Sequence, residues 1–68
     1  MGIRDAEPYV GRRVLVRHSD RHGEVHELKG VLDALEHIPM YGAAIYVDGS
    51  EISLDRVLTI EDLGKQAA

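Results

Sequence analysis

The feature that most constrains the fold is the stretch of residues 30–36, Gly-Val-Leu-Asp-Ala-Leu-Glu, a predicted strand that contains a glycine. A half-buried strand alternates apolar and polar side chains. Here the apolar residues fall on both parities: Val31, Leu32, Ala34 and Leu35. Glycine within a strand often marks a bulge or the corner of a small barrel. We therefore expect a strand that bends at Gly30, so that its two halves present different faces to one core.

The size of the chain limits it to one domain, which needs support beyond its own core. A domain of 68 residues buries only about 60% of its unfolded surface and is marginally stable alone. Such domains gain stability from disulfides, a metal or self-association, and this chain has no Cys. It also has no Phe and no Trp, so its core must come from Val, Leu and Ile, which favour strands. We therefore expect a homo-oligomer.

Five short strands are predicted, over residues 9–18, 24–36, 43–47, 51–54 and 57–60. Asp48-Gly49, between two apolar alternations, is a strong hairpin signal. Asp5 is a helix-capping residue, and Pro8 limits the helix after it to about one turn. Because every connection is short, we expect an all-β fold, a small five-stranded antiparallel barrel with a bent second strand and a short N-terminal helical turn.

The chain therefore divides into three predicted parts. Residues 1–8 form an N-terminal segment, residues 9–60 form the single β-barrel domain, and residues 61–68 form a polar C-terminal tail. We expect the tail to fray, because chain ends are poorly ordered unless they are tied down.

Two sequence patterns add a family resemblance to this fold. Residues 9–16 read Tyr-Val-Gly-Arg-Arg-Val-Leu-Val, and Gly30, Leu32 and Glu36 form the pattern Gly-x-Leu-x-x-x-Glu. Together they resemble the first strand and the first motif of the Sm-like superfamily, in which the acidic residue is usually Asp. The resemblance implies an Sm-like or SH3-like barrel in which these three residues are structural.

The resemblance also implies ring assembly and RNA binding. In Sm-like rings the fourth strand pairs with the fifth strand of the neighbouring subunit, which here joins residues 51–54 to residues 57–60. The RNA-binding loop of the family carries an Asn, whereas residues 37–42 read His-Ile-Pro-Met-Tyr-Gly. The Arg-Gly pair of the second motif corresponds to Leu-Asp-Arg-Val, which keeps Arg56 but lacks the glycine. The fold and the ring are therefore implied more directly than RNA binding.

The charge of the chain is acidic and unevenly spread. Residues 1–23 carry five Arg against three acids, whereas residues 24–68 carry three bases against nine acids, which gives the net charge of −4. Nucleic-acid binders usually show a basic footprint, so this balance argues weakly against a general one. The chain has no run of 18 apolar residues and no apolar signal region at its start, so we expect a cytoplasmic protein without a membrane partner.

The best candidate contact site is the loop that carries Met40 and Tyr41. Apolar and aromatic side chains beside a proline in a loop are either buried or used for binding. One interpretation is that they cap an end of the barrel. The other is that they dock on a protein or stack on a nucleobase, with Arg56 meeting a phosphate.

A basic cluster lies in the first part of the chain: Arg12, Arg13, Arg17 and Arg21. Arg13 and Arg17 share one face of the first predicted strand. These side chains are candidates for binding phosphates, or for pairing with acids of the second half, and we favour pairing.

Metal binding and catalysis are not expected. His18, His22 and His26 are spaced by four residues, but the turn between them should scatter their side chains, so we predict no metal and no cofactor. No base accompanies a candidate nucleophile among Ser19, Ser50 and Ser53, and the Asp33–Glu36 pair lacks a deep site, so we predict that the protein is not an enzyme. We expect a binding module that docks on a protein partner, and the alternative is a ring-forming RNA-binding protein.

Overall fold

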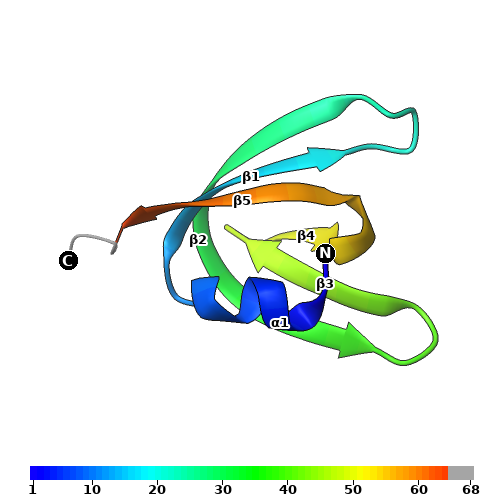
Figure 1. Cartoon of the computed structure of the whole chain (residues 1–68), viewed down its shortest axis with the longest axis horizontal. Coiled ribbons are helices and arrows are strands. Elements are labelled where there is room, and N and C mark those ends of the chain that lie inside the picture. Colours follow the sequence, from blue (N-terminus) through cyan, green and yellow to red (C-terminus); the bar gives the residue numbers. More distant parts are fainter. Residues whose placement is uncertain (65–68) are drawn as a thin grey trace.

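The structure, a computed structural model, describes residues 1–64. The chain begins with α1 (Ile3–Ala6) and a 3₁₀ turn, η1 (Glu7–Tyr9), and a second 3₁₀ turn, η2 (Leu54–Arg56), precedes the last strand. The strands are β1 (Arg13–Ser19), β2 (Val25–Ile38), β3 (Gly42–Val47), β4 (Ser50–Ser53) and β5 (Val57–Gly64). They form one antiparallel sheet in the order β4-β3-β2-β1-β5, which curls around the core with α1 at its side (Figure 1). The predicted all-β fold with five antiparallel strands and an N-terminal helical turn is confirmed.

The bend in β2 is confirmed, and the structure shows how it arises. Residues 25–31 pair with β1, whereas the remainder of the strand, from Leu32 to Ile38, pairs with β3. The register shifts between Leu32 and Ala34, so Asp33 is an extra, bulged residue. A bulge changes which face the following side chains occupy. The apolar residues therefore change parity because of the bulge at Asp33, three residues after the predicted bend at Gly30.

Gly30 allows a side chain from another turn to approach the bent strand. Asp48 and Gly49 form the β3–β4 turn with φ values of 49° and 81°, and positive φ at both central residues is typical of a type I′ hairpin. A Cβ atom at Gly30 would overlap the Asp48 carboxylate. Asp48 Oδ1 accepts a hydrogen bond from the Val31 N–H at 3.3 Å, and the Asp48 N–H donates to the Val31 carbonyl at 3.2 Å. The β3–β4 turn is thus hydrogen-bonded to β2 at Val31. The lack of a side chain at Gly30 leaves the space that the Asp48 carboxylate occupies.

The core lies inside the curled sheet and consists of small and aliphatic side chains. Alternation along β1 buries Val14 and Val16, while Arg13 and Arg17 point outward. Ala6 of α1 is fully buried and closes one side of the core. The full cluster is Ala6, Val14, Val16, Leu32, Ile45, Val47, Ile52, Leu54 and Val57. The predicted core of Val, Leu and Ile is confirmed, with Ala6 as an addition.

Both ends of the domain differ from the expected boundaries. β1 begins at Arg13 rather than at residue 9, because η1 and a turn with Gly11 at φ 84° occupy the preceding residues. β5 continues to Gly64, paired with β1, so residues 61–64 belong to the sheet and not to a polar tail. The rest of the expected tail, residues 65–68, lies outside the described residues. Within residues 1–64, no helix is long and apolar enough to cross a membrane.

Candidate functional site

The β2–β3 connection exposes the two residues predicted to make contacts. Met40 is fully exposed and Tyr41 is 81% exposed, which excludes the interpretation that they cap the barrel. The Tyr41 N–H donates to the Ile38 carbonyl at 3.0 Å, and Met40 has φ 74°. Residues 38–41 therefore have the pattern of a type II turn, with Pro39 at its second position and Met40 at its third. The third residue of such a turn has a positive φ and is usually Gly. The tip is therefore a defined turn that presents an apolar and an aromatic side chain to solvent.

The basic cluster is partly used for pairing inside the molecule. Arg17 Nε lies 2.6 Å from Glu27 Oε2 across β1 and β2. Arg12 Nη2 donates to Asp62 Oδ1 at 3.2 Å; its Nε lies 2.9 Å from Asp62 Oδ2, but that N–H is not directed at the oxygen. Among residues 1–64, Arg13 has no ion pair and is exposed. Pairing with acids of the second half is therefore observed for Arg12 and Arg17, and Arg13 remains a candidate contact residue.

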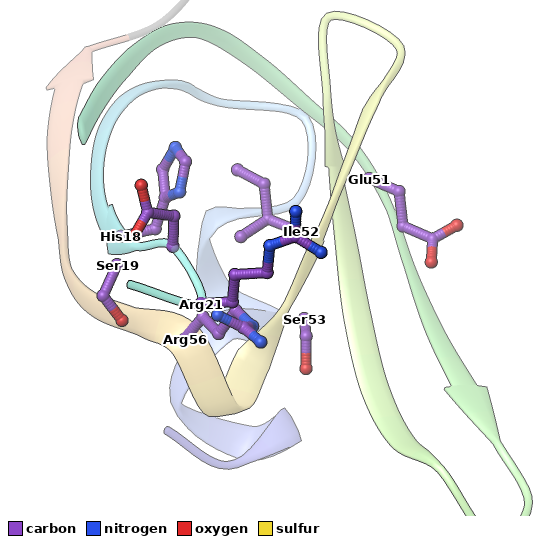
Figure 2. Close-up of a pocket in the computed structure, with 8 residues that line it drawn as sticks. His18, Ser19, Arg21, Glu51, Ile52, Ser53 and Arg56 are labelled. Carbon is purple, nitrogen blue, oxygen red and sulfur yellow. The ribbon is translucent and has the colours of Figure 1, made fainter. Parts of the chain in front are cut away.

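Arg56 lies in an open pocket of about 450 Å³ between the end of β1 and the β4–η2 segment (Figure 2). Arg21, from the β1–β2 turn, also lines it, and neither arginine has an ion pair among the described residues. Glu51 contributes to the rim, with its carboxylate directed away from the other labelled side chains in Figure 2. The remaining lining residues are His18, Ser19, Asp20, Ile52 and Ser53. The pocket thus presents two guanidinium groups beside hydroxyl groups, a combination suited to an anionic ligand group.

Two of the serines considered as nucleophiles, Ser19 and Ser53, line this pocket. An activated serine donates a hydrogen bond to a neighbouring base. Within residues 1–64, no side-chain hydrogen bond joins either hydroxyl to an imidazole or a carboxylate. The arrangement therefore offers hydrogen-bonding groups to a ligand. Met40 and Tyr41 do not line the pocket, so the tip and the pocket are separate candidate contact sites.

The prediction that the turn separates the side chains of His18, His22 and His26 is wrong for His18 and His26. His18 and His26 are directly opposite each other in the β1–β2 pairing, and their ring centroids are 5.7 Å apart. His26 Nε2 lies 2.8 Å from Asp20 Oδ2. This hydrogen bond, together with backbone N–H donors from Glu24 and His22, lowers the pKa of the Asp20 carboxyl. His22 is at the centre of the hairpin, so His18 and His26, each four residues from it, lie opposite each other. This equal spacing is the sequence signal for the cross-strand pair.

Glu36, predicted to be structural, makes a polar bridge across three strands. The Tyr46 hydroxyl lies 2.5 Å from Glu36 Oε2 and 3.0 Å from Glu51 Oε2, so one hydroxyl proton faces carboxylates on β2 and β4. Both carboxylates stabilise the neutral hydroxyl, and Glu36 has the larger effect in raising the pKa of Tyr46 above its usual range. The acid of the Gly-x-Leu pattern thus supports the pairing of β2, β3 and β4.

This bridge predicts a loss of stability at alkaline pH. The pKa of Tyr46 is higher in the folded state, so its contribution is complete below about pH 10, the ordinary tyrosine value, and is lost as the pH rises through the folded pKa. We expect Tyr46→Phe to show a smaller decrease of the unfolding free energy above about pH 10 than the wild type. Tyr41→Phe is the matched control, because Tyr41 is exposed, and it should follow the wild type. Identical alkaline profiles for Tyr46→Phe and Tyr41→Phe would contradict the role of the bridge.

Comparisons of the chain with protein-family models, curated proteins and solved structures gave no match. The Sm-like resemblance therefore stays a prediction, and the described geometry is the basis for the function proposed below.

Proposed function

We propose that the protein is a non-catalytic cytoplasmic binding module that docks on a protein partner through the tip formed by Met40 and Tyr41. The observation that carries this proposal is the state of Met40, which is fully exposed and also has φ 74°. A non-glycine residue in the left-handed region costs on the order of 1–3 kcal/mol. Met40 makes no buried contact that offsets this cost, so a binding role accounts for its presence at the tip.

The surroundings of the tip indicate the kind of partner surface that fits. Tyr41 adds an aromatic ring with a polar end, and Met is an adaptable apolar side chain; both types are enriched in protein interfaces. Glu36, four residues before Met40 on β2, adds an exposed carboxylate. An apolar recess bordered by basic side chains is therefore the complementary partner surface.

The first test is the variant Met40→Gly, which separates binding from folding. Glycine accepts the positive φ of the turn, so the unfolding free energy should stay the same or rise by up to about 1 kcal/mol. Binding of the host partner that copurifies with the wild-type protein should fall at least about tenfold, because an anchor residue is lost. Val25→Ala is the control, since Val25 is an exposed apolar residue of β2 away from the tip. Undiminished binding by Met40→Gly in a titration would contradict the docking role.

Self-association is part of the same proposal, and the edges of the sheet support it. β4 and β5 are the two terminal strands of the sheet order. An edge strand has free N–H and C=O groups that a second chain can pair with. We expect sedimentation to show a species larger than the 7.5 kDa chain, and a monomer at all concentrations would rule out the oligomer.

RNA binding is the second candidate, and the pocket with Arg21 and Arg56 supports it. Two guanidinium groups at one pocket are able to bind a phosphate, and Tyr41 is exposed for stacking. Filter binding of labelled RNA at two salt concentrations distinguishes the candidates. Tight, salt-sensitive binding that Arg56→Gln weakens would favour RNA, and no binding at low salt would exclude it.

A further inference from the structure

The end of the β1–β2 hairpin gathers two imidazoles and two carboxylates. His18 and His26 face each other across the strands, with ring centroids 5.7 Å apart. The donor atoms of Asp20, Glu24 and His26 all lie within 4.8 Å of one another. Neither the docking tip nor the role of the arginines accounts for this group, which we call the hairpin cluster (Asp20, Glu24 and His26, with the ring of His18 beside that of His26).

The backbone of the turn holds the central carboxylate in place. Asp20 Oδ1 accepts hydrogen bonds from the N–H groups of His22 at 2.8 Å and Glu24 at 3.0 Å. The Asp20 N–H also donates to the Glu24 carbonyl at 2.9 Å, which closes the turn. Oδ2 of Asp20 is left to face His26 Nε2. One oxygen is thus fixed by the turn and the other is directed at an imidazole, which is how outer hydrogen bonds orient metal ligands.

We propose that the hairpin cluster binds a divalent transition-metal ion, with zinc as the best-fitting probe. Its donors are imidazole nitrogen and carboxylate oxygen, a set that suits zinc and its neighbours, whereas magnesium and calcium prefer oxygen alone. In a tetrahedral zinc site with bonds of about 2.0–2.1 Å, neighbouring donor atoms are about 3.3 Å apart. The pair Asp20 Oδ2–His26 Nε2, at 2.8 Å, needs to open only slightly. Glu24 is exposed, so rotation of its side chain is able to close the wider separations.

A metal at this place would connect β2 to the turn of the hairpin. His26 belongs to β2, and Asp20 and Glu24 begin and end the turn. A small domain without Cys gains stability from such a clamp, because binding to the folded state alone shifts the folding equilibrium. His18 and Asp20 also line the pocket, so the ion would add positive charge beside Arg21 and Arg56. The inference does not depend on the proposed docking function.

The test uses the full chain, freed of metal with a chelator and titrated with zinc by calorimetry and thermal melting. We expect one zinc per chain, and a melting temperature roughly 10–20 °C higher at zinc a hundredfold above its dissociation constant. His26→Gln should weaken zinc binding at least about tenfold, since even outer-shell changes cost this much. Glu24→Gln is a second variant, at an exposed turn residue whose side chain has no fold contact to lose. His37→Gln, an exposed histidine of β2 outside the cluster, is the matched control.

The outcomes separate this site from unspecific binding. Loss of affinity in His26→Gln and Glu24→Gln, with an unchanged His37→Gln and no effect of magnesium, would support the proposal. Equal zinc affinity in all four proteins would overturn it. So would a magnesium affinity equal to that of zinc, which indicates attraction by charge alone. A larger assembly that forms only when zinc is added would likewise overturn it, because the ligands would then come from two chains.

Discussion

Replacing Leu32 by alanine is expected to lower the free energy of unfolding by about 2–5 kcal/mol. Leu32 is fully buried, and it lies where β2 changes partner from β1 to β3. Its backbone also holds the chain before β1, because the Gly11 N–H donates to the Leu32 carbonyl and the Leu32 N–H donates to the Arg12 carbonyl. Truncation removes apolar contacts and leaves a cavity at this junction. A core of this size supplies about 3–5 kcal/mol in total, so the variant should be partly unfolded in water.

Chemical denaturation followed by circular dichroism measures this loss. Leu58→Ala is the matched control, because it removes the same atoms from a side chain that is 51% exposed. Its unfolding free energy should stay within about 0.5 kcal/mol of the wild type. If Leu32→Ala were no less stable than Leu58→Ala, Leu32 would not be the central core residue that the structure shows.

Replacing Gly30 by valine is expected to destabilise the fold by about 1–3 kcal/mol, as overpacking does. The new Cβ would occupy the space of the Asp48 carboxylate. Either the carboxylate moves and the hydrogen bond from the Val31 N–H is lost, or the bend of β2 opens. Both results weaken the contact between the β3–β4 turn and the bent strand.

A double-mutant cycle distinguishes this close approach from an effect on strand propensity. Asp48→Gly removes the carboxylate and tolerates the φ of 49° at that position. In this background Gly30→Val should cost less, with a coupling free energy of about 0.5–3 kcal/mol. Additive effects of the two substitutions would show that the Asp48 carboxylate is not the obstacle.

The candidate sites were predictable where the signal was local. Pro39, Met40 and Tyr41 indicate a turn with unusual side chains, and the structure places all three in solvent. The pairing of Arg17 with Glu27 follows from the antiparallel register of one hairpin. The pocket was not predicted, because Arg21 and Arg56 are far apart in the sequence and meet only when the sheet curls.

The hairpin cluster shows a different limit of the sequence argument. The spacing of His18 and His26 aligns the two side chains on a helix, whereas a turn between them is expected to separate them. In an antiparallel hairpin, residues equally distant from the centre of the turn lie opposite each other. Once the turn is centred on His22, the register places the two rings together. The pairing of the two rings depends on one register, which the sequence alone leaves open.

By itself the sequence determined the strands, the Asp48-Gly49 turn and the need for a bent second strand, because side-chain alternation and turn chemistry act over a few neighbouring residues. The tertiary structure decided why the bend occurs. The bulge at Asp33 depends on the register between β2 and β3, and the open space at Gly30 is filled by a carboxylate from another turn. It also decided that Arg12 meets Asp62 and that Arg21 and Arg56 line one pocket, because these residues are distant in the chain and come together only when the whole sheet curls around its core.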